Sequence, residues 1–119
     1  MRNSPLLLAA LASAALGACA NTPPPREEMA LARASVNQAE QPAARHAPEQ
    51  LLSAQRKLSL AEEAMRKEDH ERARRLAAEA EVDARLALAI AESSQARDSL
   101  RQVQESIAAM KQELMRSKP

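Results

Sequence analysis

Apolar residues recur along this chain at alternating intervals of three and four, which is the spacing of one face of an α-helix. A first helix is predicted from Glu27 to about Gln41, where Pro42 ends it, and residues 42–47 are predicted to form a turn. A second helix is predicted from Pro48, whose fixed φ suits a first helical turn. The two apolar stripes consist of Met29, Ala32, Val36 and Ala39, and of Leu51, Ala54, Leu58, Ala61 and Met65.

The polar run from Glu68 to Glu71 is predicted to separate the second helix from a third. Asp69 suits the N-cap of that third helix, and Glu71 would lie in its first turn. One continuous helix is the competing interpretation, because the run contains neither Gly nor Pro. We favour a turn, since a single isolated helix from Pro48 onward would leave its apolar stripes unpaired.

The third helix is predicted from His70 to about Ser117, and it carries two apolar stripes. Because Ala80 and Val82 lie about 200° apart around the helix, the stripes face nearly opposite ways. From Val82 to Ala91 the helix is therefore apolar on two sides, as expected if two neighbours pack on it. The first stripe is Ala73, Ala77, Ala80, Ala84, Ala87 and Ala91, and the second is Val82, Leu86, Ala89, Ser93, Ala96, Leu100, Val103, Ile107, Met110 and Leu114.

Helix lengths predict that part of the third helix has no cover. The first two helices reach about 22–30 Å each, whereas the third would run about 70 Å. Its second half should project as an amphipathic rod, and an exposed apolar stripe of that length predicts an interaction surface. The alternative is a bend near Ser93 that folds the last segment back as a fourth helix, although no turn signal supports it. The candidate surface residues are Leu100, Val103, Ile107, Met110 and Leu114.

The predicted fold class is therefore all-α: an antiparallel, alanine-rich helical bundle or hairpin with a long, coiled-coil-like C-terminal helix. Composition agrees, because the chain has no aromatic residue and its one glycine is Gly17. The net charge is +1, and both signs are interspersed. Nucleic-acid binding is not expected, since it needs clustered basic residues and usually aromatic side chains for stacking.

The N-terminus has the pattern of an export signal. A short basic segment containing Arg2 precedes an apolar run from Leu6 to Leu16, which is too short to span a bilayer and suits a signal peptide. The run ends in Leu16-Gly17-Ala18-Cys19, which resembles a bacterial lipobox. That resemblance implies a signal peptide over residues 1–18 and acylation of Cys19 with several fatty chains such as palmitate. The acyl chains would hold the protein at a membrane.

Two further inferences follow at this junction. Ordinary cleavage after Ala20 is the alternative, and it would release a soluble periplasmic protein. The residue after the cysteine is Ala20, and in this respect the chain resembles lipoproteins that are sorted to the outer membrane. We therefore expect an outer-membrane anchor with the protein facing the periplasm. Residues 19–26 then form a proline-rich tether that contains three consecutive prolines, and residues 27–119 form the helical domain.

Several segments resemble a family of small bacterial envelope proteins known as domain of unknown function 4398. They are residues 30–34 (ALARA), 47–51 (APEQL), 61–65 (AEEAM), 69–77 (DHERARRLA) and 82–87 (VDARLA). The family's usual glycine before Asp69 is Glu68 here, and its usual aromatic residue is His70. The resemblance implies a lipoprotein of helical architecture, and it implies no activity.

Residues that could carry chemistry are few. His46 and His70 are far apart in sequence, and the positions one helical turn from His70 are mostly basic, so no metal site is predicted. No cofactor motif is present, and we expect no enzyme, because a rod without aromatic residues offers little of a water-excluding pocket. A small enzyme would require such a pocket.

The leading prediction is a non-catalytic, lipid-anchored helical protein that uses its free stripe to self-associate or to bind a partner helix. The alternative is a helical-hairpin module similar to a tetratricopeptide unit, which would bind a periplasmic peptide or a peptidoglycan-associated partner. The first predicts binding along residues 82–114, and the second predicts it near residues 51–76.

Overall fold

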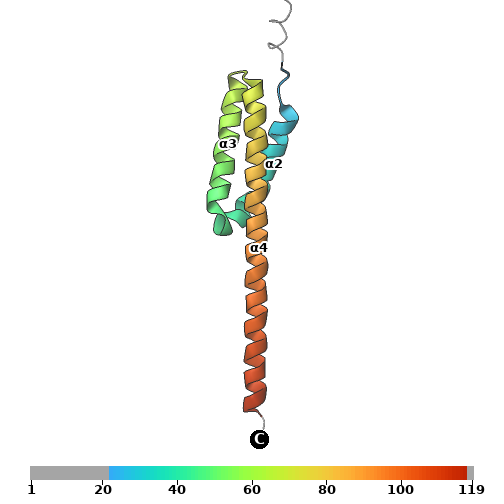
Figure 1. Cartoon of the computed structure of the whole chain (residues 1–119), viewed down its shortest axis with the longest axis vertical. Helices are drawn as coiled ribbons and strands as arrows, with labels where there is room; N and C mark the ends of the chain where they lie inside the picture. Colours follow the sequence, from blue (N-terminus) through green and yellow to red (C-terminus); the bar gives the residue numbers. More distant parts are fainter. Residues whose placement is uncertain (1–21, 118–119) are drawn as a thin grey trace, which may run out of the picture.

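The structure of the protein is a computed structural model that describes residues 22–117. Three helices make up nearly all of this range: α2 (Arg26–His46), α3 (Pro48–Arg66) and α4 (His70–Arg116). No strand occurs among residues 22–117. Figure 1 shows α2 and α4 running in the same direction with α3 antiparallel to both, and α4 continuing well beyond the other two. The predicted all-α class with a long C-terminal helix is confirmed.

The core of the bundle is built almost entirely from alanine. One face of α4 is buried against α2 and α3, and we call it the alanine face. Small side chains here allow two helices to approach α4 closely. The buried hydrophobic residues that are larger than alanine are Met29 and Val36 on α2 and Leu51 on α3. The alanine face consists of Ala73, Ala77, Ala80, Ala84, Ala87 and Ala91, each at most 1% exposed.

The prediction that Pro42 ends the first helix is wrong, because α2 continues through Pro42 to His46. A proline inside a helix costs about 3 kcal/mol, since one hydrogen bond is lost and its ring crowds the preceding turn. Burial offsets part of this cost, because the added turn extends the buried α2 stripe to Ala43, which is fully buried. The chain turns only at Ala47, which leaves helical geometry immediately before Pro48, as residues before proline tend to do.

The predicted turn between the second and third helices is present. Glu68 has a positive φ of 59°, and the Asp69 amide donates to the Ala64 carbonyl at 3.0 Å. With the Glu68 amide bonded to the Met65 carbonyl at 3.1 Å, this is a Schellman ending in which Glu68 holds the usual glycine position. Asp69 caps α4 as predicted, because its carboxylate accepts a hydrogen bond from the Arg72 amide at 3.1 Å.

The bundle begins immediately after the predicted tether. Arg26, assigned to the tether, is already the first residue of α2, and Pro25 before it is buried. Arg74 of α4 holds this junction by donating to the Pro23 carbonyl at 3.3 Å and by pairing with Glu28 at 2.9 Å. The start of α2 therefore lies beside the start of α4, at the opposite end of α4 from its tip (Figure 1). Cys19 and the predicted signal peptide lie outside the described residues.

Candidate interaction surface

The face of α4 opposite the alanine face is exposed along its whole length. In the C-terminal half, the five predicted surface residues are between 46% and 66% exposed. In the bundle half, Val82 and Leu86 are 64% and 51% exposed. We call the complete set the exposed stripe: Val82, Leu86, Ala89, Ser93, Ala96, Leu100, Val103, Ile107, Met110 and Leu114.

The exposure of Val82 and Leu86 corrects one prediction. The sequence suggested that two neighbours cover α4 on both apolar sides between Val82 and Ala91. Instead, α2 and α3 both pack on the alanine face, and the buried cluster joins Val36 and Ala39 of α2 to Leu51 of α3 and to α4. Two helices lying side by side on one face leave the opposite face open. The exposed surface therefore extends beyond the five candidate residues of the rod, and it starts within the bundle at Val82.

The bundle ends where α2 turns into α3. Ala47 and Leu51 lie in the same buried cluster as Ala91, so the cover of α4 stops near that residue. Beyond it, α4 runs to Arg116 as one continuous helix without folding back. The segment from Ala91 to Arg116 adds about 38 Å at 1.5 Å per residue. We call this segment the rod, and it matches the predicted projection.

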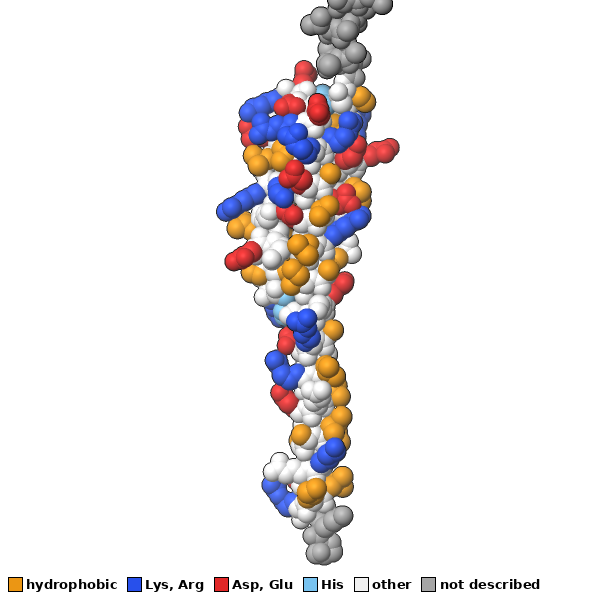
Figure 2. Space-filling model, viewed as in Figure 1, with side chains coloured by type: hydrophobic (Ala, Val, Ile, Leu, Met, Phe, Trp, Pro, Cys, Tyr) orange, Lys and Arg blue, Asp and Glu red, His pale blue; other side chains and the backbone are white. Residues whose placement is uncertain are grey.

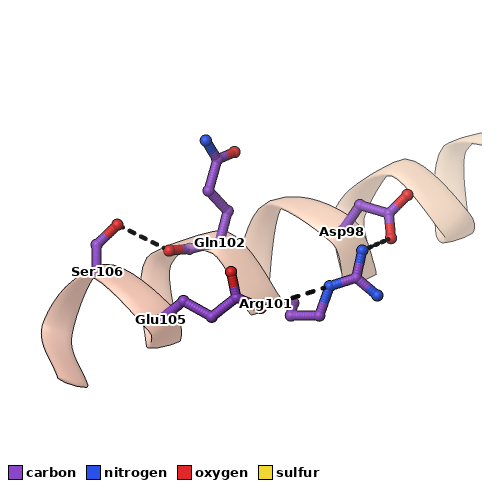
Figure 3. Close-up of polar contacts among 5 residues, drawn as sticks. All are labelled: Asp98, Arg101, Gln102, Glu105 and Ser106. Carbon is purple, nitrogen blue, oxygen red and sulfur yellow. Dashed lines mark hydrogen bonds and ion pairs between the residues drawn. The ribbon is translucent and has the colours of Figure 1, made fainter. Parts of the chain in front are cut away.

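The rod changes the chemistry of the face that is buried in the bundle. In line with the alanine face it carries Asp98, Gln102 and Glu105. Arg101 pairs with Asp98 at 2.9 Å and lies 3.9 Å from Glu105, while the Ser106 hydroxyl donates to the Gln102 carbonyl at 2.8 Å (Figure 3). These contacts stay within one helix and favour a solvated surface. The rod is therefore polar on this face and apolar on the exposed stripe.

The space-filling view shows the same division. In Figure 2, hydrophobic side chains follow one edge of the rod, whereas most of the charged side chains lie on the other edge. The exposed stripe has the alternating spacing of four and three that packs one helix against another. A surface of this shape binds a helix lying lengthwise, and it does not enclose a small molecule.

Charged groups in the bundle connect its helices. Lys57 of α3 lies 2.8 Å from Asp83 and 3.6 Å from Glu79 of α4, and the Ser53 hydroxyl donates to Asp83 at 2.6 Å. Partial burial raises the pKa of Asp83, but hydrogen bonds from Lys57 and Ser53 outweigh it and hold that pKa below 3.8. The same contact with Asp83 raises the pKa of Lys57 above 10.5. These shifts come from ion pairs that fix α3 against α4.

Two more carboxyl groups have lowered pKa values, also at ion pairs. The pKa of Glu28 is lowered by backbone hydrogen bonding and by Arg74, and that of Glu63 by Lys67 one helical turn away. Arg33 of α2 reaches Glu62 of α3 at 2.9 Å. The sequence did not predict the pairs between helices, because helical spacing reveals only neighbours within one helix.

The two histidines stay apart. His46 ends α2 and lines an open groove with Pro42 and Gln95, whereas His70 begins α4 at the other end of the bundle. Within residues 22–117 no group of three metal-ligating side chains comes together. No helix in that range is long and apolar enough to cross a membrane.

Comparison with known proteins identifies the family. A family model described as a domain of unknown function (DUF4398) matches residues 27–103. The chain belongs to this family. The matched range contains nearly all of α2, all of α3 and α4 as far as Val103, so the DUF4398 domain comprises the bundle and the first part of the rod. No curated protein and no solved structure matches the chain.

Proposed function

We propose that this protein is a non-catalytic, lipid-anchored component of the bacterial envelope that binds a helical partner along the exposed stripe of α4. Acyl chains on Cys19 would hold it at the periplasmic face of the outer membrane. The observation that carries the binding role is the exposed stripe itself. The side chains of Leu100, Ile107 and Leu114 are exposed to solvent, although alanine is buried on another face of the same helix.

Exposed side chains of this size have an energetic consequence. Each Å² of apolar surface that is removed from water contributes about 25 cal/mol to the free energy of binding. A partner helix that covered the large side chains of the stripe would therefore be bound favourably. Monomeric proteins rarely expose a continuous apolar surface of this kind without using it. The stripe is therefore better explained as an interface than as ordinary surface composition.

The position of the first residue of α2 supports an anchored rod. The residues that follow Cys19 lead to Arg26, at the end of the bundle farthest from the tip of α4 (Figure 1). An acylated Cys19 would place the bundle near the membrane and the rod farther into the periplasm. The tether would then lie beyond the start of α4, and the binding surface would begin about three turns later at Val82 and extend away from the membrane.

A non-catalytic role agrees with the titratable groups. The lowered pKa values of Asp83, Glu28 and Glu63 each have an ion-pair partner or hydrogen bonds as their cause. They favour charged, paired carboxylates, whereas a general acid at neutral pH needs a raised pKa. The tetratricopeptide-like alternative is less well supported, because α2 already occupies one side of the α3–α4 hairpin. Met29 and Val36 of α2 are buried against that side.

The anchor and the surface are tested separately. Cys19→Ser should abolish labelling of the protein with a fatty-acid analogue, because the acceptor thiol is lost. Normal-sized protein in the soluble periplasm of this variant would instead support cleavage after Ala20. Retained labelling in the variant would contradict acylation at Cys19.

The double variant Leu100→Asp, Ile107→Asp tests the surface by crosslinking in living cells. We expect loss of the crosslinked species with the bundle still helical, because both side chains are exposed. The matched control is Gln102→Asp, Ala109→Asp, which adds the same charges at the same spacing on the opposite face of the rod. Undiminished crosslinking in the Leu100, Ile107 variant would reject the stripe as the binding surface.

A further inference from the structure

We propose that the occupant of the exposed stripe is a second copy of this chain, paired in parallel and in register as a two-stranded coiled coil from Val82 to Leu114. This inference rests on the proposed function, because it identifies the partner of the same surface. Three observations carry it: the narrow width of the stripe, the charges on its two flanks, and the open side of α4.

The width of the stripe favours two strands. Its members occupy alternating a and d positions of a heptad, with Leu86, Leu100 and Ile107 at a and Val82 and Val103 at d. A wider apolar face would be needed to contact two other helices at once. The flanking residues are almost all polar or charged: Asp83, Ile90, Arg97, Gln104 and Lys111 at e, and Arg85, Glu92, Ser99, Ser106 and Glu113 at g. The apolar member, Ile90, is half-buried and packs against the core of its own bundle.

Charges on the flanks favour the parallel direction. In a parallel pair each g residue lies near the e residue five positions later on the other helix. Glu92 and Arg97 have this relation, so two such pairs of opposite charge form by symmetry. Both are exposed, and among the residues that the structure describes neither takes part in an ion pair. They are therefore free to pair across the interface.

The antiparallel arrangement fits the same charges less well. With the full stripe overlapped, it sets Arg97 against Arg97 of the partner subunit. Its attractive pairs would use Asp83 and Arg85, which already bind Lys57 at 2.8 Å and Glu81 at 2.6 Å within one chain. It does place small side chains such as Ala96 opposite large ones such as the partner's Leu100, so it is the competing outcome of the test. Anchoring from one membrane surface also requires that the rods point the same way.

The packing of the bundle leaves room for this neighbour. Lys57 reaches α4 at Asp83, and Glu28 reaches it at Arg74, so α3 and α2 lie on the two sides next to the alanine face. Val82 and Leu86 lie opposite the alanine face and are more than half exposed, and Val82 lines an open hollow with Lys57 of α3. A partner helix on this third side would meet α4 without displacing either one. Pairing can therefore continue from the rod into the bundle.

A cysteine at Ser93 tests direction and register together. Ser93 is an exposed a position, and in a parallel, in-register pair it faces its own copy at a separation that a disulfide can bridge. The full chain carrying Ser93→Cys is expressed in bacteria and treated with a mild oxidant. We expect the band to shift from the monomer to the covalent dimer. The parent chain controls for Cys19, and Gln102→Cys on the opposite face controls for chance collisions.

Three results would overturn the inference. One is a Ser93→Cys dimer no more abundant than that of Gln102→Cys. Another is preferential joining of Ser93→Cys to a co-expressed chain carrying Val103→Cys, which would indicate the antiparallel pair. The third is a disulfide to a different protein in place of the dimer.

Charge exchange provides a second readout. Glu92→Arg should reduce the Ser93→Cys dimer because like charges then meet, and adding Arg97→Glu should restore it. A dimer unaffected by Glu92→Arg would contradict the assigned pairing.

The outcomes separate this inference from the proposed function. If no dimer forms but Leu100→Asp, Ile107→Asp still abolishes crosslinking to another protein, the binding surface stands and the second copy is rejected. If the dimer forms but Cys19→Ser retains acyl labelling, pairing stands and the anchor is wrong.

Discussion

The two halves of α4 share one helix and one apolar spacing, yet they use opposite faces. In the bundle half the buried face is all alanine, whereas in the rod the apolar face carries Leu100, Ile107 and Leu114 and remains exposed. These large apolar side chains of α4 are thus exposed to solvent, whereas its alanines on the opposite face are buried. Side-chain size therefore decides which face packs within the monomer: alanine lets α2 and α3 approach together, and the larger residues remain available for another helix.

Small buried side chains also limit the stability of the bundle. Each alanine removes little apolar area from water, so no single contact dominates the core. Close approach of the helices provides much of the packing, and a larger group at the alanine face would crowd α2 and α3, because these alanines are at most 1% exposed. The bundle half should therefore tolerate enlargement poorly, and the rod should tolerate it well.

The largest expected effect comes from Ala84→Glu in the bundle half. Ala84 is fully buried, so the variant places an unpaired carboxylate between closely packed helices. We expect a loss of about 3 kcal/mol or more in the free energy of unfolding, measured by urea denaturation. Ala109→Glu is the matched control, because Ala109 lies in line with Ala84 on α4 but is exposed. Its effect should stay within about 0.5 kcal/mol. Equal effects at both positions would contradict the division of α4 into two halves.

A smaller effect is expected from the ion pairs of the bundle. The pKa of Asp83 is lowered in the folded chain, so its contribution is present above pH 3.8 and is lost as the pH falls through the lower folded value. Asp83→Asn should lose about 1 kcal/mol of stability at neutral pH, because the charged hydrogen bonds to Lys57 and Ser53 weaken. Its stability should also decline less in acid than that of the parent chain, with Glu28 and Glu63 accounting for part of the remaining decline.

Asp98→Asn in the rod is the comparison for this electrostatic prediction. Asp98 pairs with Arg101 on the same helix, and both side chains are at least half exposed. Surface pairs of this kind contribute little, so urea denaturation across the acid range should show a curve close to that of the parent chain. If Asp98→Asn lowered the free energy of unfolding as much as Asp83→Asn, the electrostatic difference between the rod and the bundle would be contradicted.

Much of the fold could be predicted because helical periodicity is a local property. The alanine face, the cap at Asp69 and the length of α4 all follow from spacing and from one capping residue. The end of α2 could not be predicted in this way. Pro42 signals a stop locally, and only the burial of Ala43 against the other helices shows why the helix continues.

The candidate surface was predicted in part. The spacing identified Leu100 and Ile107, but it could not show whether α2 and α3 share one face of α4 or cover two. That choice depends on how closely three helices pack, which is set by the alanines together.

The backbone of Glu68 is a second feature that local sequence could not predict. Its positive φ is imposed by the Schellman ending, although the residue itself gives no glycine signal.

Pairing along the exposed stripe is tested most directly by hydrogen exchange of the α4 amides at several protein concentrations. Exchange reports how often each amide opens to solvent. Amides from Ala73 to Ala91 should be protected at every concentration, because α2 and α3 cover them. Amides from Leu100 to Leu114 should exchange quickly in dilute solution and slowly as concentration rises, because only an intermolecular partner can cover the stripe. Rod amides whose protection does not change with concentration would contradict the claim that the exposed stripe of α4 pairs with a second copy.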